Sequence, residues 1–249
     1  MDIVIGFFAA LIASTIATFI GGASSLILLP VLILLTSGTF AGLLAVTKAN
    51  AFLMCLTAVN KHRKRMQFDM KLLWILIIFG LIGTGIGTYF LQYHFNEKFF
   101  HILLGIVLII SAAYLYFKKE VGLHEGHERK MNFKMYTITS FFVLGLNILN
   151  GLFGGTGMFT TLFLIVVLRY SYMNAVALGF VSYLAVNFVQ AGYLLSTETY
   201  SWWLLAGIMG GAILGAHLGT HFLFLKGNKL AKTVGMVVIM ILGVKMLVG

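Results

Sequence analysis

Long apolar segments separated by short polar connections make up most of this 249-residue chain. Several segments reach roughly 20 residues, the length at which an α-helix crosses a bilayer core. The first half is predicted to form helices at 3–20, 24–36, 40–60, 70–92 and 99–117. The second half is predicted to form helices at 135–153, 157–169, 173–195, 202–225 and 230–248. The pattern therefore predicts an all-α polytopic membrane protein with five segments per half.

The composition supports this fold class. Hydrophobic residues make up 60% of the chain and charged residues only 10%, whereas soluble domains carry about 25% charged residues. The net charge of +10 does not indicate nucleic-acid binding, because the basic residues gather in short connections between apolar segments. That distribution is typical of signals that set membrane topology.

The two halves carry matching glycine-rich sequences. The glycine pair Gly21-Gly22 interrupts the first half, and Gly154-Gly155 interrupts the second. The stretch 83–91 matches 215–223 with an offset of 132 residues, and Asn96 matches Asn228 at the same offset. A constant offset between similar stretches indicates an internal duplication. The predicted parts are a first membrane repeat at 1–117, a linker at 118–134 and a second membrane repeat at 135–249.

An odd number of segments per half inverts the second half relative to the first. With the basic cluster at 61–71 placed in the cytoplasm, 14 of the 17 Lys and Arg residues fall on that side. This agreement with the positive-inside rule supports the two inverted repeats. Such repeats are characteristic of secondary transporters.

The first two segments of each half allow two arrangements. Residues 3–36 either cross the membrane twice or form a re-entrant hairpin with Gly21-Gly22 at its tip. Both arrangements give the same sidedness. The 13-residue segments 24–36 and 157–169 would span only about 20 Å, which favours hairpins whose tips approach each other near the membrane midplane.

The glycine breaks are the first candidate site. A helix interruption in hydrocarbon is tolerated where the backbone is buried in protein or faces a watery cavity. Each break exposes the N-terminus of the next helix, and such ends attract anions. Close helix packing through small residues is the alternative explanation, but the symmetric pair favours a binding site formed by Gly21, Gly22, Ser24, Ser25, Gly154, Gly155, Thr156 and Gly157.

The second candidate feature is Lys48, which lies inside the segment 40–60 with Thr47 and Asn50 beside it. Intramembrane charges are usually functional, although a lysine can also extend its ammonium group to the membrane surface. All seven acidic residues lie in loops or at segment ends. The charges therefore predict a substrate that is a small anion bound by Lys48, Thr47, Asn50 and the helix ends.

A different class of function remains open. His217 and His221 have the i, i+4 spacing that can bind a metal, and further histidines lie in the linker. These residues would suit a membrane-embedded metal-handling protein or enzyme, but two ligands without a third are a weak metal signal. No metal and no other cofactor are expected.

The duplicated glycine breaks, together with Leu29-Pro30 and the stretch 45–50, resemble the sulfite exporter TauE/SafE family of permeases. In the second half the resemblance rests on Gly154-Gly155, Gly157 and Ala177-Leu178-Gly179. It covers nearly the whole chain except the linker. The chain departs from the family pattern at Ala23-Ser24-Ser25, which replaces a longer glycine run, and at Phe163 and Phe180.

The resemblance implies transport of sulfur-containing anions such as sulfite or organosulfonates. We therefore expect a non-enzymatic secondary transporter in the cell membrane, working by alternating access, with export slightly favoured. Its expected partners are the small anion and the lipid bilayer, without nucleic acid. A homo-oligomer is compatible with the sequence, and an anion channel is a further alternative.

The topology predicts that both termini face outward and that the linker 118–134 faces the cytoplasm. In a His124→Cys variant, a membrane-impermeant thiol reagent added outside intact cells should leave the new cysteine unmodified. Rapid modification from outside would contradict the topology.

Overall fold

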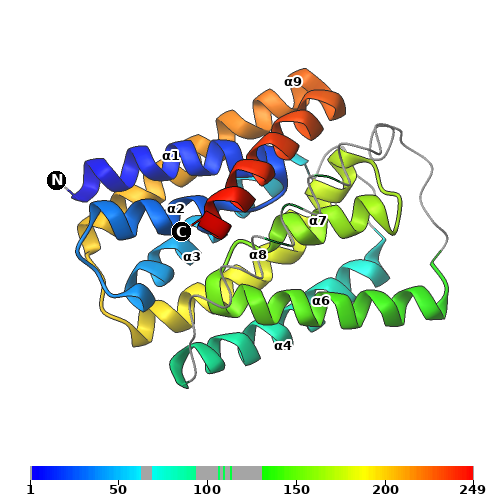
Figure 1. Cartoon of the computed structure of the whole chain (residues 1–249), viewed down its shortest axis with the longest axis horizontal. Helices are drawn as coiled ribbons and strands as arrows, with labels where there is room; N and C mark the ends of the chain where they lie inside the picture. Colours follow the sequence, from blue (N-terminus) through cyan, green and yellow to red (C-terminus); the bar gives the residue numbers. More distant parts are fainter. Residues whose placement is uncertain are drawn as a thin grey trace.

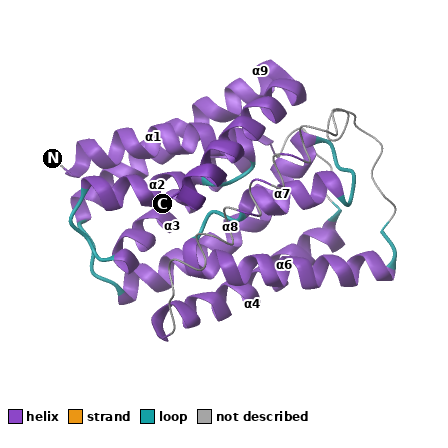
Figure 2. Cartoon of the chain, in the orientation of Figure 1, coloured by secondary structure: helices purple, strands orange, loops and turns teal. Residues whose placement is uncertain are grey.

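The computed structural model describes residues 2–62, 69–93 and 131–248, and the single positions 106, 109 and 113. This part of the chain is helical and contains no strand (Figure 2). Its helices are α1 (Asp2–Ile20), α2 (Ser24–Leu35), α3 (Phe40–His62), α4 (Met70–Tyr93), α6 (Phe133–Phe153), α7 (Gly157–Val166), α8 (Tyr172–Thr197) and α9 (Trp202–Val248).

The polytopic membrane fold predicted from the sequence is confirmed. Among the described residues, five helices are long and apolar enough to cross a membrane: α3, α4, α6, α8 and the first part of α9. Their outer faces present large apolar side chains, and exposed aromatic residues lie near helix ends, as Trp74, Tyr89 and Trp202 do. Aromatic residues at this position are typical of the bilayer interface.

The hairpins α1–α2 and α6–α7 enter the bundle from opposite ends. Figure 1 shows the N-terminus and the α2–α3 connection at one end, and the start of α6 and the α7–α8 connection at the other. The helices α2 and α7 have 12 and 10 residues, so they extend only about 18 and 15 Å. Two hairpins that crossed completely would place their tips on opposite membrane faces. Their tips instead touch, which supports the re-entrant arrangement.

The helix pairs repeat across the two halves. The contact of α1 with α9 has its counterpart in α6 with α4, and the contact of α3 with α9 has its counterpart in α8 with α4. The pairs α1–α2 and α2–α3 correspond in the same way to α6–α7 and α7–α8, while α3 packs against α8. A two-fold axis that exchanges the halves produces this pairing, and it passes between α3 and α8.

Each hairpin packs against its own part of the apolar core. One cluster joins α1 and α2 to the first part of α3 and the start of α9, with Leu28, Leu32 and Leu44 fully buried. The other joins α7 to α4, α8 and the later part of α3. Helix α3 belongs to both clusters, so it connects the two halves through their cores.

One predicted boundary is wrong. Residues 226–229 were expected to form a connection between two helices, but α9 is helical without interruption from Trp202 to Val248. Figure 1 shows that its ribbon nevertheless turns back where the colour changes from orange to red. Glycine and its neighbours permit a sharp bend while the flanking turns keep their hydrogen bonds, and Gly227 lies in this stretch.

Several other predictions lie outside the described residues. These are the helix at 99–117, almost all of the linker 118–134 and the middle of the basic cluster at 61–71. The boundaries of the two repeats and the sidedness of the protein therefore stay predictions.

The close contact of α4 with α6 generates a stability prediction. A Cβ atom at Gly87 would collide with the backbone carbonyl of Ile148 and come within 3.0 Å of the Gly151 Cα, whereas a Cβ at Gly85 meets nothing within 4 Å. Gly87→Ala should therefore destabilise the protein by about 1–3 kcal/mol, measured as a lower melting temperature in detergent. Gly85→Ala on the same helix is the matched control and should leave the melting temperature equal or higher. Equal behaviour of the two variants would contradict this packing.

Candidate functional site

The two glycine tips meet inside the bundle. Gly21, Gly22, Gly154 and Gly155 all have positive φ angles, between 76° and 102°, a backbone region that side chains other than glycine rarely adopt. A Cβ atom at Gly157 would lie 2.5 Å from the carbonyl oxygen of Gly22. The backbone of each tip is therefore covered by the backbone of the other.

The helices that begin at these tips have no side-chain caps. Ala23 precedes α2 and Thr156 precedes α7, and neither side chain accepts a hydrogen bond from its helix. By contrast, Asn132 caps α6 and Ser171 caps α8. The first N–H groups of a helix lack partners within it, so α2 and α7 direct two sets of donors and two positive dipole ends into the same region.

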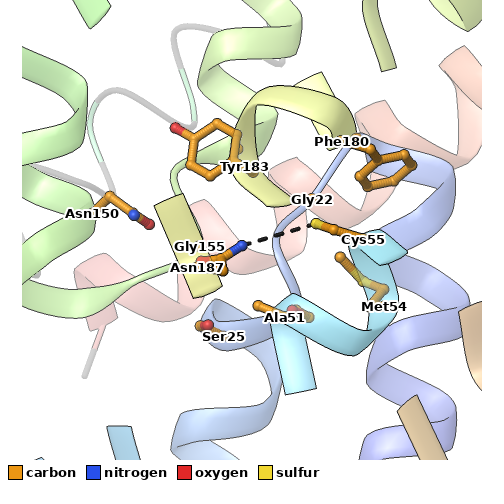
Figure 3. Close-up of a pocket in the computed structure, with 13 residues that line it drawn as sticks. Gly22, Ser25, Ala51, Met54, Cys55, Asn150, Gly155, Phe180, Tyr183 and Asn187 are labelled. Atoms are coloured by element: carbon orange, nitrogen blue, oxygen red, sulfur yellow. Dashed lines mark hydrogen bonds between the residues drawn. The ribbon is translucent and has the colours of Figure 1, made fainter. Parts of the chain in front are cut away.

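A small cavity lies between the glycine tips and the helices α3 and α8, which flank the two-fold axis (Figure 3). Its volume is about 10 Å³, which is about enough for one water molecule. The cavity in this structure therefore has no open space for a larger ion. The cavity is lined by Gly21, Gly22, Ser24, Ser25, Ala51, Met54, Cys55, Asn150, Gly155, Gly157, Phe180, Tyr183 and Asn187.

Lys48 lies beside this cavity and is fully buried, with 0% exposure. Its ammonium group donates hydrogen bonds to the backbone oxygen of Asn150 at 2.9 Å and to the Asn150 side-chain oxygen at 3.1 Å. The side chain therefore does not extend to the membrane surface. Of the acidic residues described, Asp2, Asp69 and Glu198 lie at helix ends, so none of them neutralises Lys48.

Two further buried polar groups, one at a glycine tip and one on α3, have unused hydrogen-bonding capacity. The hydroxyl of Ser25 and the amide nitrogen of Asn50 are buried without a partner in the described part of the chain. A Cβ at Gly154 would lie 2.8 Å from the Ser25 Cβ and 3.1 Å from the Lys48 Cε, so Ser25 and Lys48 flank the same glycine. A buried polar group without a partner costs free energy, and an anion beside Lys48 would accept from the Ser25 hydroxyl.

The remaining predicted site residues lie at different distances from the cavity. The Thr47 hydroxyl donates to the Leu44 carbonyl of its own helix at 2.8 Å, and the side chain does not line the cavity. Asn50 accepts a hydrogen bond from Ser14 through its side-chain oxygen. The Thr156 hydroxyl lies 3.1 Å from the Tyr183 hydroxyl. The glycines, the two serines and Lys48 are thus brought together, while Thr47 points into its own helix.

Cys55 and side chains of α8 also line the cavity, although the sequence did not indicate them as site residues. Phe180, Tyr183 and Asn187 line the cavity from α8, and the Asn187 amide donates to the Cys55 sulfur at 3.9 Å (Figure 3). The repeat offset contained a signal, because 132 residues separate Lys48 from Phe180 and Cys55 from Asn187. Residues related in this way meet when they lie close to the symmetry axis.

The histidines proposed for the metal-handling alternative do not form a metal site in the described structure. His217 and His221 are exposed on α9, and no group of three potential metal ligands comes together among the described residues. The linker histidines lie outside those residues.

The bond between Lys48 and Asn150 leads to a prediction on stability. Asn150→Leu removes one acceptor from a buried ammonium group and should lower the free energy of unfolding by about 1.5–3 kcal/mol. Asn150→Asp restores an acceptor and should retain or exceed the wild-type melting temperature. A tolerated leucine together with a destabilising aspartate would contradict a charged Lys48 at this position.

Comparison with known proteins agrees with this architecture. The sequence model of the Sulfite exporter TauE/SafE family matches residues 6–246. The chain is also 27% identical over 245 residues to a protein of Haemophilus influenzae named "Probable membrane transporter protein", covering 96% of this chain and 93% of that protein. No solved structure matches. Since the family match extends over nearly the whole chain, the protein belongs to the sulfite exporter TauE/SafE family of membrane transporters.

Proposed function

We propose that this transporter carries a small sulfur-containing anion, such as sulfite or an organosulfonate, across the cell membrane by alternating access. The observation that carries the proposal is the environment of Lys48. Its ammonium group is fully buried, it has only neutral acceptors from Asn150, and no described carboxylate approaches it. A buried charge is stabilised by a partner of opposite sign, and a substrate anion would supply that partner.

The groups around Lys48 favour an oxyanion. The Ser25 hydroxyl and the uncapped N-termini of α2 and α7 are all hydrogen-bond donors. The Asn50 amide, two residues from Lys48 on α3, is a further buried donor without a partner among the described residues. Several donors arranged around one cation suit a ligand with several negatively charged oxygen atoms. Sulfite and sulfonate groups have three such oxygens, in keeping with the substrate named for the family.

Alternating access is supported by the closed cavity and by the two opposed hairpins. A cavity of about 10 Å³ has no room for an anion with several heavy atoms, so the hairpins or the helices beside them must separate during binding. Because the hairpins enter from opposite ends (Figure 1), withdrawal of either one would open the site toward a different side. This is the geometry by which inverted repeats give two alternating states.

Export is the direction that the charges favour. A membrane potential negative inside drives an anion outward by about 2.3 kcal/mol per charge per 100 mV. Uptake would need a coupled ion, and all seven acidic residues lie in loops or at predicted segment ends, away from positions where a carboxylate could carry a proton through the membrane.

The test compares Lys48→Met with the neighbouring Thr47→Val in proteoliposomes. Lys48→Met retains most of the length of the side chain but removes its charge, so the affinity for sulfite or a sulfonate should weaken by about 1.5–3 kcal/mol, which is more than tenfold. Thr47→Val removes a hydroxyl that bonds within its own helix and should change affinity less than twofold. The measurement is radiolabelled anion flux against concentration.

Melting temperatures of both variants must first show that they fold. If Lys48→Met folds and transports the anion with wild-type affinity, Lys48 does not bind substrate. If no sulfur oxyanion is transported by the wild-type protein, the proposed substrate class is wrong. Flux far faster than a carrier can cycle would favour a channel.

A further inference from the structure

A second and much larger cavity lies between α4 and α8. Its volume is about 330 Å³, against about 10 Å³ for the cavity at the glycine tips. Apolar side chains form its walls, among them Leu81, Val186 and Val189. Its polar residues are Thr84, Thr88 and Gln190, all of them buried. The cavity is thus an apolar cleft with a polar floor.

Hydrogen bonds connect the polar residues of the cleft to Lys48 through Asn150. The Gln190 amide donates to the Thr88 hydroxyl at 3.0 Å and to the backbone oxygen of Gly151 at 3.1 Å. The Asn150 amide donates to the Thr84 hydroxyl at 3.3 Å, and the other side of Asn150 accepts from Lys48. Thr84, which lines the cleft, is thus connected to Lys48 through one side chain, that of Asn150.

Burial of these polar side chains costs free energy if lipid fills the cleft. Gln190 is 3% exposed, and its side-chain oxygen is buried without a partner in the described part of the chain. Hydrocarbon offers no hydrogen bond to such a group, which costs free energy in an apolar environment. Water entering the cleft would satisfy this oxygen after a small rotation of the side chain.

The related region of the other repeat keeps only one of these polar groups, because Thr88 corresponds to the buried Thr220. At an offset of 132 residues, Thr84 corresponds to Ala216 and Gln190 to Ala58, and both alanines are fully buried. Polar side chains in a membrane interior are expensive to retain without a use. The presence of Thr84 and Gln190 on one side alone points to a specific role for the α4–α8 cleft.

We propose that the α4–α8 cleft is a water-filled vestibule through which the anion reaches Lys48, with the Thr84–Asn150 contact separating the two. Its lining residues extend from Leu81 to Tyr89 on α4 and from Val186 to Tyr193 on α8, that is, from the middle of each helix toward its C-terminal end, which is the predicted outer side. This inference rests on the proposed transport function, because it assigns the cleft to the path of the substrate. It adds an approach site that the anion occupies before it binds at the glycine tips.

Cysteine accessibility tests the vestibule. Gly85 lines the cleft, and a Cβ there meets nothing within 4 Å, so Gly85→Cys places a thiol in open space. Ile86 is 38% exposed but does not line the cleft, which makes Ile86→Cys a control at nearly the same depth. Both positions lie about 11–12 Å along the helix from Tyr93. The wild-type protein, whose Cys55 is buried, is the blank.

A charged, membrane-impermeant thiosulfonate is added from the predicted outer side without any substrate present. Gly85→Cys should react at least tenfold faster than Ile86→Cys, since thiosulfonates react with thiolates in water. Modification of Gly85→Cys should also reduce anion flux at least fivefold, and modification of Ile86→Cys with a lipid-soluble reagent should not. Val189→Cys on the α8 wall, where the native side chain is 55% exposed, repeats the test if Gly85→Cys does not fold.

Each contrary result has a separate meaning. Equal, slow reaction at both positions would show a lipid-filled groove and overturn the vestibule. Fast modification of Gly85→Cys with unchanged flux would show a wet cleft outside the substrate path, and would also overturn the proposal. Labelling needs no substrate, so the wrong choice of anion leaves the accessibility result intact and is detected by the flux of the unmodified protein.

Discussion

The structure depends on one constraint: where a helix is interrupted inside the membrane, its unpaired backbone groups must be buried in protein. Each hairpin interrupts its helices at a glycine pair, and the freed N–H and C=O groups cannot be hydrated in lipid. The structure solves this by placing each tip against the other, with Gly157 against the Gly22 carbonyl and Gly155 against Leu26. The contact requires glycine, because positive φ angles and close backbone approach both exclude larger side chains. The same contact brings two uncapped helix ends to one point.

Lys48 gives this meeting point its charge. A buried ammonium with neutral acceptors contributes less to stability than an apolar side chain of the same size would. In the proposed function, the lysine makes the site attractive to anions, and the hydrogen bonds from Lys48 to Asn150 hold the ammonium group in place before the substrate binds. Asn150 also bonds to Thr84, so a change at the lysine can be transmitted to α4 through one side chain.

The sequence predicted most of the helices but not all of the site. The ends of α1, α2, α4 and α6 fall within two residues of their predicted positions, because glycine, polar turns and apolar length are local signals. The choice between crossing and re-entrant hairpins could not be made from topology, since both alternatives give the same sidedness. It was decided by a contact between tips that lie 133 residues apart. The proximity of the candidate site residues could be predicted where local rules apply, at the glycines and at Lys48. Tyr183 and Cys55 had no local signal, because their positions in the cavity wall depend on which faces of α3 and α8 meet. For Cys55 the signal lay only in the repeat offset to Asn187.

The two-fold arrangement explains why the central residues differ between the halves. Inverted repeats can exchange their conformations, which gives inward-open and outward-open states of similar energy. Residues on the axis between α3 and α8 take part in both states, and there the repeat is broken: Lys48 corresponds to Phe180, and Cys55 to Asn187. Two lysines at these positions would repel each other across a cavity of about 10 Å³, since like charges at short distance are strongly unfavourable in a low dielectric. One lysine close to the axis avoids this repulsion and, in the proposed alternating-access cycle, would remain beside the anion while the hairpins exchange roles. The divergence of the two halves at these positions is therefore what the proposed function requires, because a single anion needs a single lysine.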